Sequence, residues 1–235
     1  MLPFLQKPVL TDLPDYLDVV QSKRARRLAL RLDPAERRMK LIVPERASIN
    51  KAYEFAARHL DWIESKIAGL PSHTPFTDGN IIPLLGEDVT LDIYYDKTLK
   101  RTDIILKNNR LSVKTNKEDP TGRIQRFLRE KAREVLTPMA REKALRIDKK
   151  ISAIEIRDPK TRWGSCNEDG KISLSWRLIL APPAAMDYVV AHEVAHLAHL
   201  DHSRAFWRVC ESLSFDYKRG KTWMRTQGSN LHHFG

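Results

Sequence analysis

The sequence predicts an α+β fold, in which a strand-rich N-terminal subdomain of residues 1–118 precedes a mixed α/β domain of residues 119–235. Two observations support this class. In the first half, apolar and polar residues alternate with the period of two that marks half-buried strands, as at residues 28–32. In the second half, helical spacing dominates, and the chain is expected to be helical from about residue 183 onward.

In the N-terminal subdomain, strands are expected between residues 16 and 44, where Pro44 closes the last one. Ser48 is the expected N-cap of one long helix, which Gly69 ends. Residues 71–80 are rich in turn-forming residues and are expected to be a linker. Further strands are expected at residues 84–85, 89–94, 104–106 and 111–113, with a hairpin turn at Asn108-Asn109.

In the C-terminal domain, Asp119-Pro120 is expected to begin an amphipathic helix whose apolar face extends from Ile124 to Met139. Pro138 is expected to kink or break this helix, because it lacks a main-chain donor and its ring clashes with the preceding turn. Strands are then expected at residues 152–157, 162–166 and 171–174, with a hairpin turn at Asp169-Gly170.

The composition is that of a globular protein, with 42% hydrophobic and 30% charged residues. No apolar stretch reaches the ~18 residues of a membrane span, and no signal peptide is visible. The two cysteines, Cys166 and Cys210, form no disulfide framework or Cys-x-x-Cys motif, so we expect a cytoplasmic location. The net charge of +11 favours anionic partners such as nucleotides, nucleic acid or acidic peptides, although a generally basic protein would carry the same charge.

The segment from residue 192 to residue 202 concentrates histidines. It begins with His192-Glu193-x-x-His196, which follows an apolar lead-in and is expected on a helix that ends near Leu200. Positions i and i+4 share a helix face, so both imidazoles can reach one zinc ion at ~2.0–2.1 Å. Glu193 would lie beside the ion, where it can take a proton from the zinc-bound water.

A catalytic zinc usually has three protein ligands, so one more is needed. His199 lies on nearly the same face as His192 but ~10 Å further along the axis, which is out of reach on a straight helix. His202 can reach the ion if the chain turns back, with Asp201 or Ser203 capping the next helix. We therefore expect His202 as the third ligand, and His199 as a residue behind the ligands or on the surface.

Further motifs accompany these residues across nearly the whole chain. In order they are Ser22-x-Arg24-Ala25-Arg26-Arg27, Asp61-Trp62-Ile63, Arg162-Trp163-Gly164-Ser165-Cys166, Trp176-Arg177-Leu178, His192-Glu193-x-x-His196-Leu197 and His202-Ser203-x-x-Phe206-Trp207. Together they resemble the YgjP-like metallopeptidase family. The resemblance implies a zincin-type catalytic half with a strand-rich N-terminal extension. It also implies zinc at His192, His196 and His202, with Glu193 as general base.

The resemblance indicates the site more firmly than the substrate. The family name specifies a peptidase, but its members are also associated with pyrophosphatase action on nucleoside triphosphates such as UTP. The SprT-like proteases, which act on proteins crosslinked to DNA, look like more distant relatives. This chain lacks the His-Gly pair that they place after the zinc helix.

Residues 162–166 are expected to form a strand beside the zinc helix, where it can bind an extended substrate through its main chain. Gly164 would permit close backbone approach, and Ser165 is a further candidate contact. Arg162 could hold a phosphate or carboxylate or stabilise an oxyanion, or it could be a surface charge. Arg177 is a weaker candidate of the same kind.

Three functions are compatible with the sequence, which favours the first. A zinc metallopeptidase would use Glu193 to move the proton while zinc polarises the scissile carbonyl. A nucleotide pyrophosphatase would direct the same water at phosphorus, with Mg²⁺ arriving with the nucleotide, but no glycine-rich phosphate loop is present. A nucleic-acid-binding module with a structural zinc would need His199 or Cys166 as a fourth ligand. The oligomeric state is left open.

Overall fold

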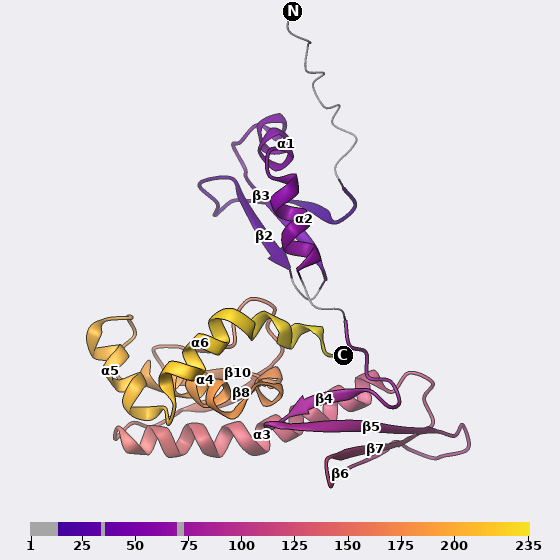
Figure 1. Cartoon of the computed structure of the whole chain (residues 1–235). Coiled ribbons are helices and arrows are strands. Elements are labelled where there is room, and N and C mark those ends of the chain that lie inside the picture. The colour runs from indigo at the N-terminus through magenta and orange to yellow at the C-terminus, as the bar shows by residue number, and fades with distance from the viewer. Residues whose placement is uncertain (1–13, 34–35, 70–72) are drawn as a thin grey trace, which may run out of the picture. The chain divides into compact units, whose positions relative to one another are not determined.

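The computed structural model describes residues 14–33, 36–69 and 73–235. The chain divides into two compact units, Met1–Ser72 and His73–Gly235, and each is described by itself (Figure 1). The fold is α+β, as the sequence predicts, because both units combine a mixed sheet with helices. The predicted boundary after residue 118 lies inside the second unit, since the strands before it share one hydrophobic core with the helices after it.

The first unit is a three-stranded sheet with two short helices. Its elements are β1 (Leu17–Ser22), β2 (Ala29–Asp33), β3 (Arg38–Pro44), α1 (Ile49–Ala57) and α2 (Leu60–Ala68). Strand β3 is central, parallel to β1 and antiparallel to β2. Alternate residues of β3 are fully buried, and they form a core with Ala52, Ala56 and Ile63 from the helices.

The single helix predicted from Ser48 to Gly69 is wrong, because α1 and α2 are separate and meet at Arg58 and His59. His59 leaves the helical region, with φ −117° and ψ 12°. Its ring Nδ1 lies 2.7 Å from the carbonyl oxygen of Phe55. In a continuous α-helix, the carbonyl of Phe55 would accept the main-chain N–H of His59. Here the side chain of His59 binds that carbonyl instead, so the helical hydrogen bond is lost.

The second unit begins with a four-stranded sheet. Its strands are β4 (Ile81–Leu84), β5 (Glu87–Tyr95), β6 (Asp103–Lys107) and β7 (Arg110–Thr115). The order is β4-β5-β7-β6, with β5 parallel to β7 and the other pairs antiparallel. The predicted hairpin turn between β6 and β7 is confirmed, because Asn108 and Asn109 both adopt positive φ, at 51° and 55°.

Helix α3 (Thr121–Arg146) runs past both the four-stranded sheet and the C-terminal helices (Figure 1). The predicted helix start is displaced by one residue, because Pro120 rather than Asp119 is the N-cap; the carboxylate of Asp119 accepts the N–H of Thr121 at 2.9 Å from just outside the helix. The predicted break at Pro138 is wrong, because the helix continues through it. Pro138 is exposed, while Leu136 and Ala140 on either side are fully buried against the core.

The histidine motif lies among the remaining elements of the second unit. These are β8 (Ala153–Arg157), β9 (Gly164–Cys166), β10 (Lys171–Ser175), η1 (Trp176–Leu180), α4 (Pro183–Ala195), α5 (Arg204–Leu213), α6 (Tyr217–Gln227) and η2 (Gly228–His233). Strand β10 is central in a second mixed sheet, parallel to β8 and antiparallel to β9, so β9 is an edge strand. Within the described ranges, neither α4 nor any other helix has the length and apolar character needed to cross a membrane.

A buried ion pair fixes α4 against α3. Lys143 Nζ lies 2.5 Å from Asp187 Oδ1, and the two side chains are 4% and 6% exposed. Lys143 also donates to the carbonyl oxygen of Leu213 at 2.6 Å, at the end of α5. The second carboxylate oxygen of Asp187 accepts from Ser214 Oγ and from the N–H of Phe215. These bonds tie α3, α4 and α5 together with nearly all polar atoms of the pair satisfied.

Candidate metal centre

Two histidines lie one helical turn apart at the end of α4. His192 is inside the helix and His196 is its C-cap residue, so their side chains share a face. The helix ends earlier than Leu200, where the sequence predicts its end. A tighter turn follows, in which the N–H groups of Leu197 and Ala198 bond to carbonyls three residues back. This turn starts the chain reversal that the third histidine requires.

His202 returns to the cluster because the next helix begins directly after it. Ser203 is the N-cap of α5, and its hydroxyl accepts the N–H of Phe206 at 3.3 Å. The carboxylate of Asp201 accepts the N–H of Ser203 at 3.1 Å. The predicted second helix is therefore confirmed, and of the two predicted caps, Asp201 and Ser203, the structure selects Ser203. These two hydrogen bonds flank His202 in the chain and fix the start of α5 directly after it.

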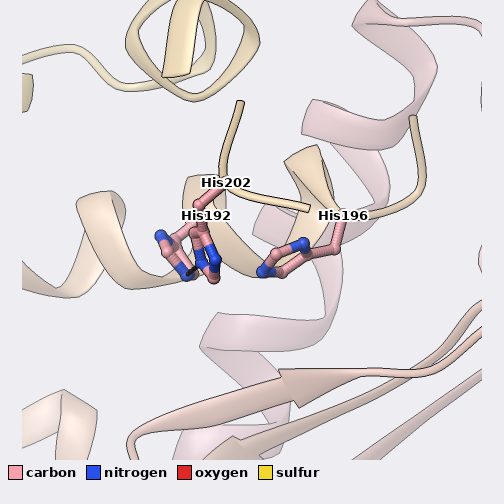
Figure 2. Close-up of side chains that lie close together, drawn as sticks. All are labelled: His192, His196 and His202. Atoms are coloured by element: carbon pink, nitrogen blue, oxygen red, sulfur yellow. Dashed lines mark hydrogen bonds between the residues drawn. The ribbon is translucent and has the colours of Figure 1, made fainter. Parts of the chain in front are cut away.

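The three imidazoles converge (Figure 2). The ligand-forming nitrogens of His192, His196 and His202 all lie within 4.8 Å of one another. The Nε2 atoms of His192 and His202 are 3.2 Å apart, close to the ~3.3 Å that separates two nitrogens around a tetrahedral ion with bonds of ~2.0–2.1 Å. The Nδ1 of His192 is buried without a partner among the described residues, so Nε2 is the nitrogen directed at the cluster. The donor set fits a divalent metal such as zinc.

The protonation of the cluster also suits a metal. Burial, followed by the charges of His196, His202 and Lys221, lowers the pKa of His192 to about 4. Burial likewise lowers the pKa of His196, and a bond to the carbonyl of His199 opposes it only in part. The carbonyl oxygen of His199 lies 3.0 Å from His196 Nδ1 and can only accept a hydrogen bond, so the proton is on Nδ1 and Nε2 is unprotonated. Neutral imidazoles are the form that binds metal.

Aromatic rings of α5 support the three imidazoles from one side. The ring of Phe206 is fully buried, and its centroid lies 4.9, 4.5 and 4.7 Å from those of His192, His196 and His202. Trp207 packs at 5.7 Å from His192 and 5.5 Å from His202. This apolar floor limits the rotamers of the histidines and lowers the local dielectric constant.

Glu193 lies next to the cluster and is only 6% exposed. Burial raises its pKa to about 8, and the charge of Arg162 opposes this rise. A Cβ atom placed on Gly164 would lie 2.5–2.7 Å from three side-chain atoms of Glu193. The space beside Gly164, which the sequence predicts to admit close approach of a substrate, is occupied by the Glu193 side chain.

Ser165 lies on the other face of β9. Neighbouring residues of a strand point to opposite faces, so Ser165 faces away from the side that Gly164 presents to Glu193. With Arg162, it lines a cavity of about 360 Å³ beside β8 and β10. Glu155 lines the same cavity, but it pairs with the basic residues of its own sheet, Arg157 and Lys171. Arg162 has no ion pair among the described residues and is the free positive charge of this cavity.

Arg177 is not placed beside the histidines. It is 7% exposed, and its guanidinium donates to Asp158 Oδ1 at 2.8 Å and to the carbonyl oxygens of Leu231 and Phe234 at 3.1 and 2.7 Å. It also lies 4.5 Å from the ring centroid of Trp176. These bonds anchor the C-terminal segment to η1, so the guanidinium is occupied inside the fold rather than available as a substrate contact.

One charged neighbour of the cluster, Lys221, is not predicted from the sequence. Lys221 of α6 lies 3.9 Å from the ring centroid of Trp207 and donates to the hydroxyl of Tyr217 at 2.7 Å. Its charge contributes to the low pKa of His192. No local pattern could reveal this, because Lys221 follows the histidine motif by a whole helix and approaches it only through tertiary packing.

The three converging histidines are a donor set expected of a metal-dependent enzyme. The family model of the YgjP-like metallopeptidase domain matches residues 26–227. The chain belongs to this family and is a hydrolase of the metallopeptidase type, a class that uses a divalent metal. No curated protein matches the chain. Among solved structures, the crystal structure of the metallopeptidase zymogen of Pyrococcus abyssi abylysin matches at 21% identity and a TM-score of 0.35, over 40% of this chain and 96% of that one.

Proposed function

We propose that the protein is a zinc-dependent peptidase in which His192, His196 and His202 hold the metal and Glu193 is the general base. The observation that carries this proposal is a buried carboxylate next to three converging imidazoles. Three protein ligands leave one position of a tetrahedral ion open, which is the pattern of catalytic rather than structural zinc.

The chemistry follows from where the side chains lie. A zinc ion, when bound, would polarise the scissile carbonyl and make a water molecule more acidic. Glu193 takes the proton of the attacking water and later delivers it to the leaving amine. Its burial suits both steps, because a carboxylate with a raised pKa holds a proton more readily at neutral pH than an exposed one.

The substrate in this proposal is a peptide in an extended conformation. Strand β9 is an edge strand, so its outer main-chain groups are not paired within the sheet, and its inner face lies against Glu193. Arg162 lies two residues before the start of β9, where it can bind a carboxylate of the substrate. A second cavity, of about 330 Å³, is lined by His196 and by the turn between β9 and β10, and it supplies room for a substrate side chain.

The alternatives have less support. A structural zinc would need a fourth ligand, but the metal-binding group found among the described residues has three members. The pKa of Cys166 is raised to about 11 by burial and the nearby Glu193, which disfavours the thiolate that zinc binds. The family match names a peptidase and gives no support to the triphosphate pyrophosphatase.

The test compares the zinc-loaded protein with Glu193→Gln and with the matched control Glu211→Gln, an exposed carboxylate on α5. Each is incubated with an unstructured protein substrate and with a panel of nucleoside triphosphates. We expect the parent and the control to cleave the protein substrate, and Glu193→Gln to lose at least ~100-fold in kcat while retaining zinc. Turnover of triphosphates alone would overturn the peptidase assignment, and full activity of Glu193→Gln would overturn the base.

A further inference from the structure

A basic cavity of about 510 Å³ lies in the second unit, and none of its lining residues belongs to the histidine cluster. It is formed by the loop before β6, the segment after β7 and the first turns of α3. Its basic lining residues come from all three segments: Lys100, Arg101, Lys117, Arg123 and Arg126. The positive charges of these five side chains repel one another. An anionic ligand bound between them would reduce this repulsion, so the cavity favours such a ligand.

The charge of this basic cavity is not neutralised from within the fold. None of the five basic side chains forms an ion pair in the part of the chain that the structure describes. Glu130 is the acidic lining residue, and it is paired with Arg133 at 3.5 Å. Nearby, the carboxylate of Asp119 is bound to the N–H of Thr121 at the helix start. The cavity therefore keeps a net positive charge.

The rim of the basic cavity is held in place by hydrogen bonds. The hydroxyls of Thr102 and Thr115 lie 2.8 Å apart, and the amide of Asn116 donates to the carbonyl oxygen of Leu99 at 3.0 Å. The N–H of Lys117 donates to Thr115 Oγ1 at 3.1 Å. The ligand thus meets a preformed pocket, which reduces the entropy lost on binding.

The floor of the basic cavity is apolar. Arg123, Arg126 and Phe127 share one face of α3, at positions i, i+3 and i+4. The half-buried ring of Phe127 and the side chain of Ile104 line the cavity together with the basic groups, and they also pack against the hydrophobic core. Sites that bind single-stranded nucleic acid combine two features. Basic side chains bind the phosphates, and an aromatic ring between them stacks on a base. The cavity volume is that of a small-molecule pocket, which admits a nucleotide unit but not a duplex.

From these observations we infer that the basic cavity binds a single-stranded nucleic acid, with phosphates on the arginines and lysines and a base against Phe127. An acidic peptide is less suited, because its carboxylates offer no planar ring to this floor. The inference does not depend on the proposed hydrolysis, because the two sites share no residue.

The test measures fluorescence anisotropy of a labelled oligothymidylate of about 12 nucleotides with the full-length zinc-loaded chain. We expect Arg123→Glu/Arg126→Glu to weaken binding at least ~10-fold and to reduce the slope of log Kd against log salt by about 1.4. Glutamate is favourable near a helix N-terminus, so the double variant should fold. Arg141→Glu, an exposed charge reversal further along α3, should bind as the parent does.

Two milder variants keep the inference testable if the double variant does not fold. Lys117→Ala should weaken binding and lower the salt slope, and Phe127→Leu should weaken binding without changing that slope. Glu193→Gln should bind as the parent does, which separates this site from the hydrolytic one. Equal weakening by Arg141→Glu would overturn the inference, as would a mononucleotide or polyglutamate competing as well as the unlabelled oligonucleotide.

Discussion

A Cβ atom on Gly164 would lie 2.5 Å from Cγ of Glu193, so β9 and α4 approach each other as closely as a glycine allows. The edge strand and the helix of the histidine motif therefore touch through the proposed general base. Any side chain on β9 at this position must displace the carboxylate, because β9 is held by its pairing with β10 and α4 is held by the core.

The first prediction is that Gly164→Ala removes activity and leaves metal binding intact. The added methyl pushes the Glu193 carboxylate away from its place beside the histidines, and a displacement of ~1 Å can cost ~100-fold in rate. The ligands are not touched. Zinc content, measured by atomic absorption, should equal that of the parent, while kcat for the protein substrate falls ~100-fold.

The matched control is Gly122→Ala. An added Cβ at Gly122 meets nothing within 4 Å, and the residue is exposed in the first turn of α3. Alanine is favoured over glycine in helices by up to ~1 kcal/mol, so this variant should be fully active and slightly more stable. A fully active Gly164→Ala would show that the Glu193 side chain is free to move without loss, and it would contradict the positioning argument.

The second prediction separates the two histidines that compete for the third ligand position. His202→Ala should lower the affinity for zinc by more than the ~10–100-fold that the loss of an outer-shell partner costs. His199→Ala should change it little, because His199 contributes its main-chain carbonyl to His196 and this group survives the substitution. Competition with a fluorescent zinc chelator measures both. If His202→Ala bound zinc as tightly as both His199→Ala and the parent, His202 would not be a ligand.

The geometry around His202 was predictable because it depends on local rules. The reach of a straight helix excludes His199 from an ion bound by His192, and a cap at Asp201 or Ser203 is compatible with the reversal that His202 requires. The helix ends at Ala195 rather than near Leu200, yet the reversal still occurs. Local sequence signals therefore predicted the convergence of the imidazoles better than the bounds of the helix that carries two of them.

The remaining features depend on contacts between segments distant in sequence. Arg177 carries the same charge as Arg162, but three groups from other segments enclose its guanidinium. The occupant of the space at Gly164 comes from α4, and periodicity gives no information about such a neighbour. The burial of Lys143 could have been inferred from the sequence, because it lies on the apolar stripe of α3. A lysine there needs a partner, since burying an unpaired charge is costly. Its partner, Asp187, could not be identified from spacing.

The third prediction concerns that buried pair. Lys143→Met leaves the carboxylate of Asp187 buried without its cation, and breaking such a pair costs ~3–5 kcal/mol of the free energy of unfolding. Urea denaturation followed by circular dichroism measures the loss. As a control, Lys131→Met removes a pair with Glu134 near the surface of the same helix, which should cost less than ~1 kcal/mol. Equal costs for the two variants would contradict a structural role for the buried pair.

The fourth prediction is a pH dependence at Asp158, which binds Arg177 away from the histidines. Burial alone would raise the pKa of Asp158, but the hydrogen bond from Arg177, together with the charges of Arg177 and Arg129, holds it below the ordinary value of 3.8. Because the folded-state pKa lies below the unfolded one, the stabilisation is present above pH 3.8 and is lost as the pH falls through the folded-state value.

Asp158→Asn should therefore lower the free energy of unfolding most near neutral pH, and its cost should shrink below pH 3.8. Urea denaturation of parent and variant between about pH 7 and about pH 3 measures this difference. Asp148→Asn is the control, because Asp148 is exposed and asparagine tolerates its positive φ of 52°. Its effect should be small at every pH. A cost of Asp158→Asn that grows with acidity would mean that the folded protein prefers the protonated carboxyl, which contradicts the ion pair with Arg177.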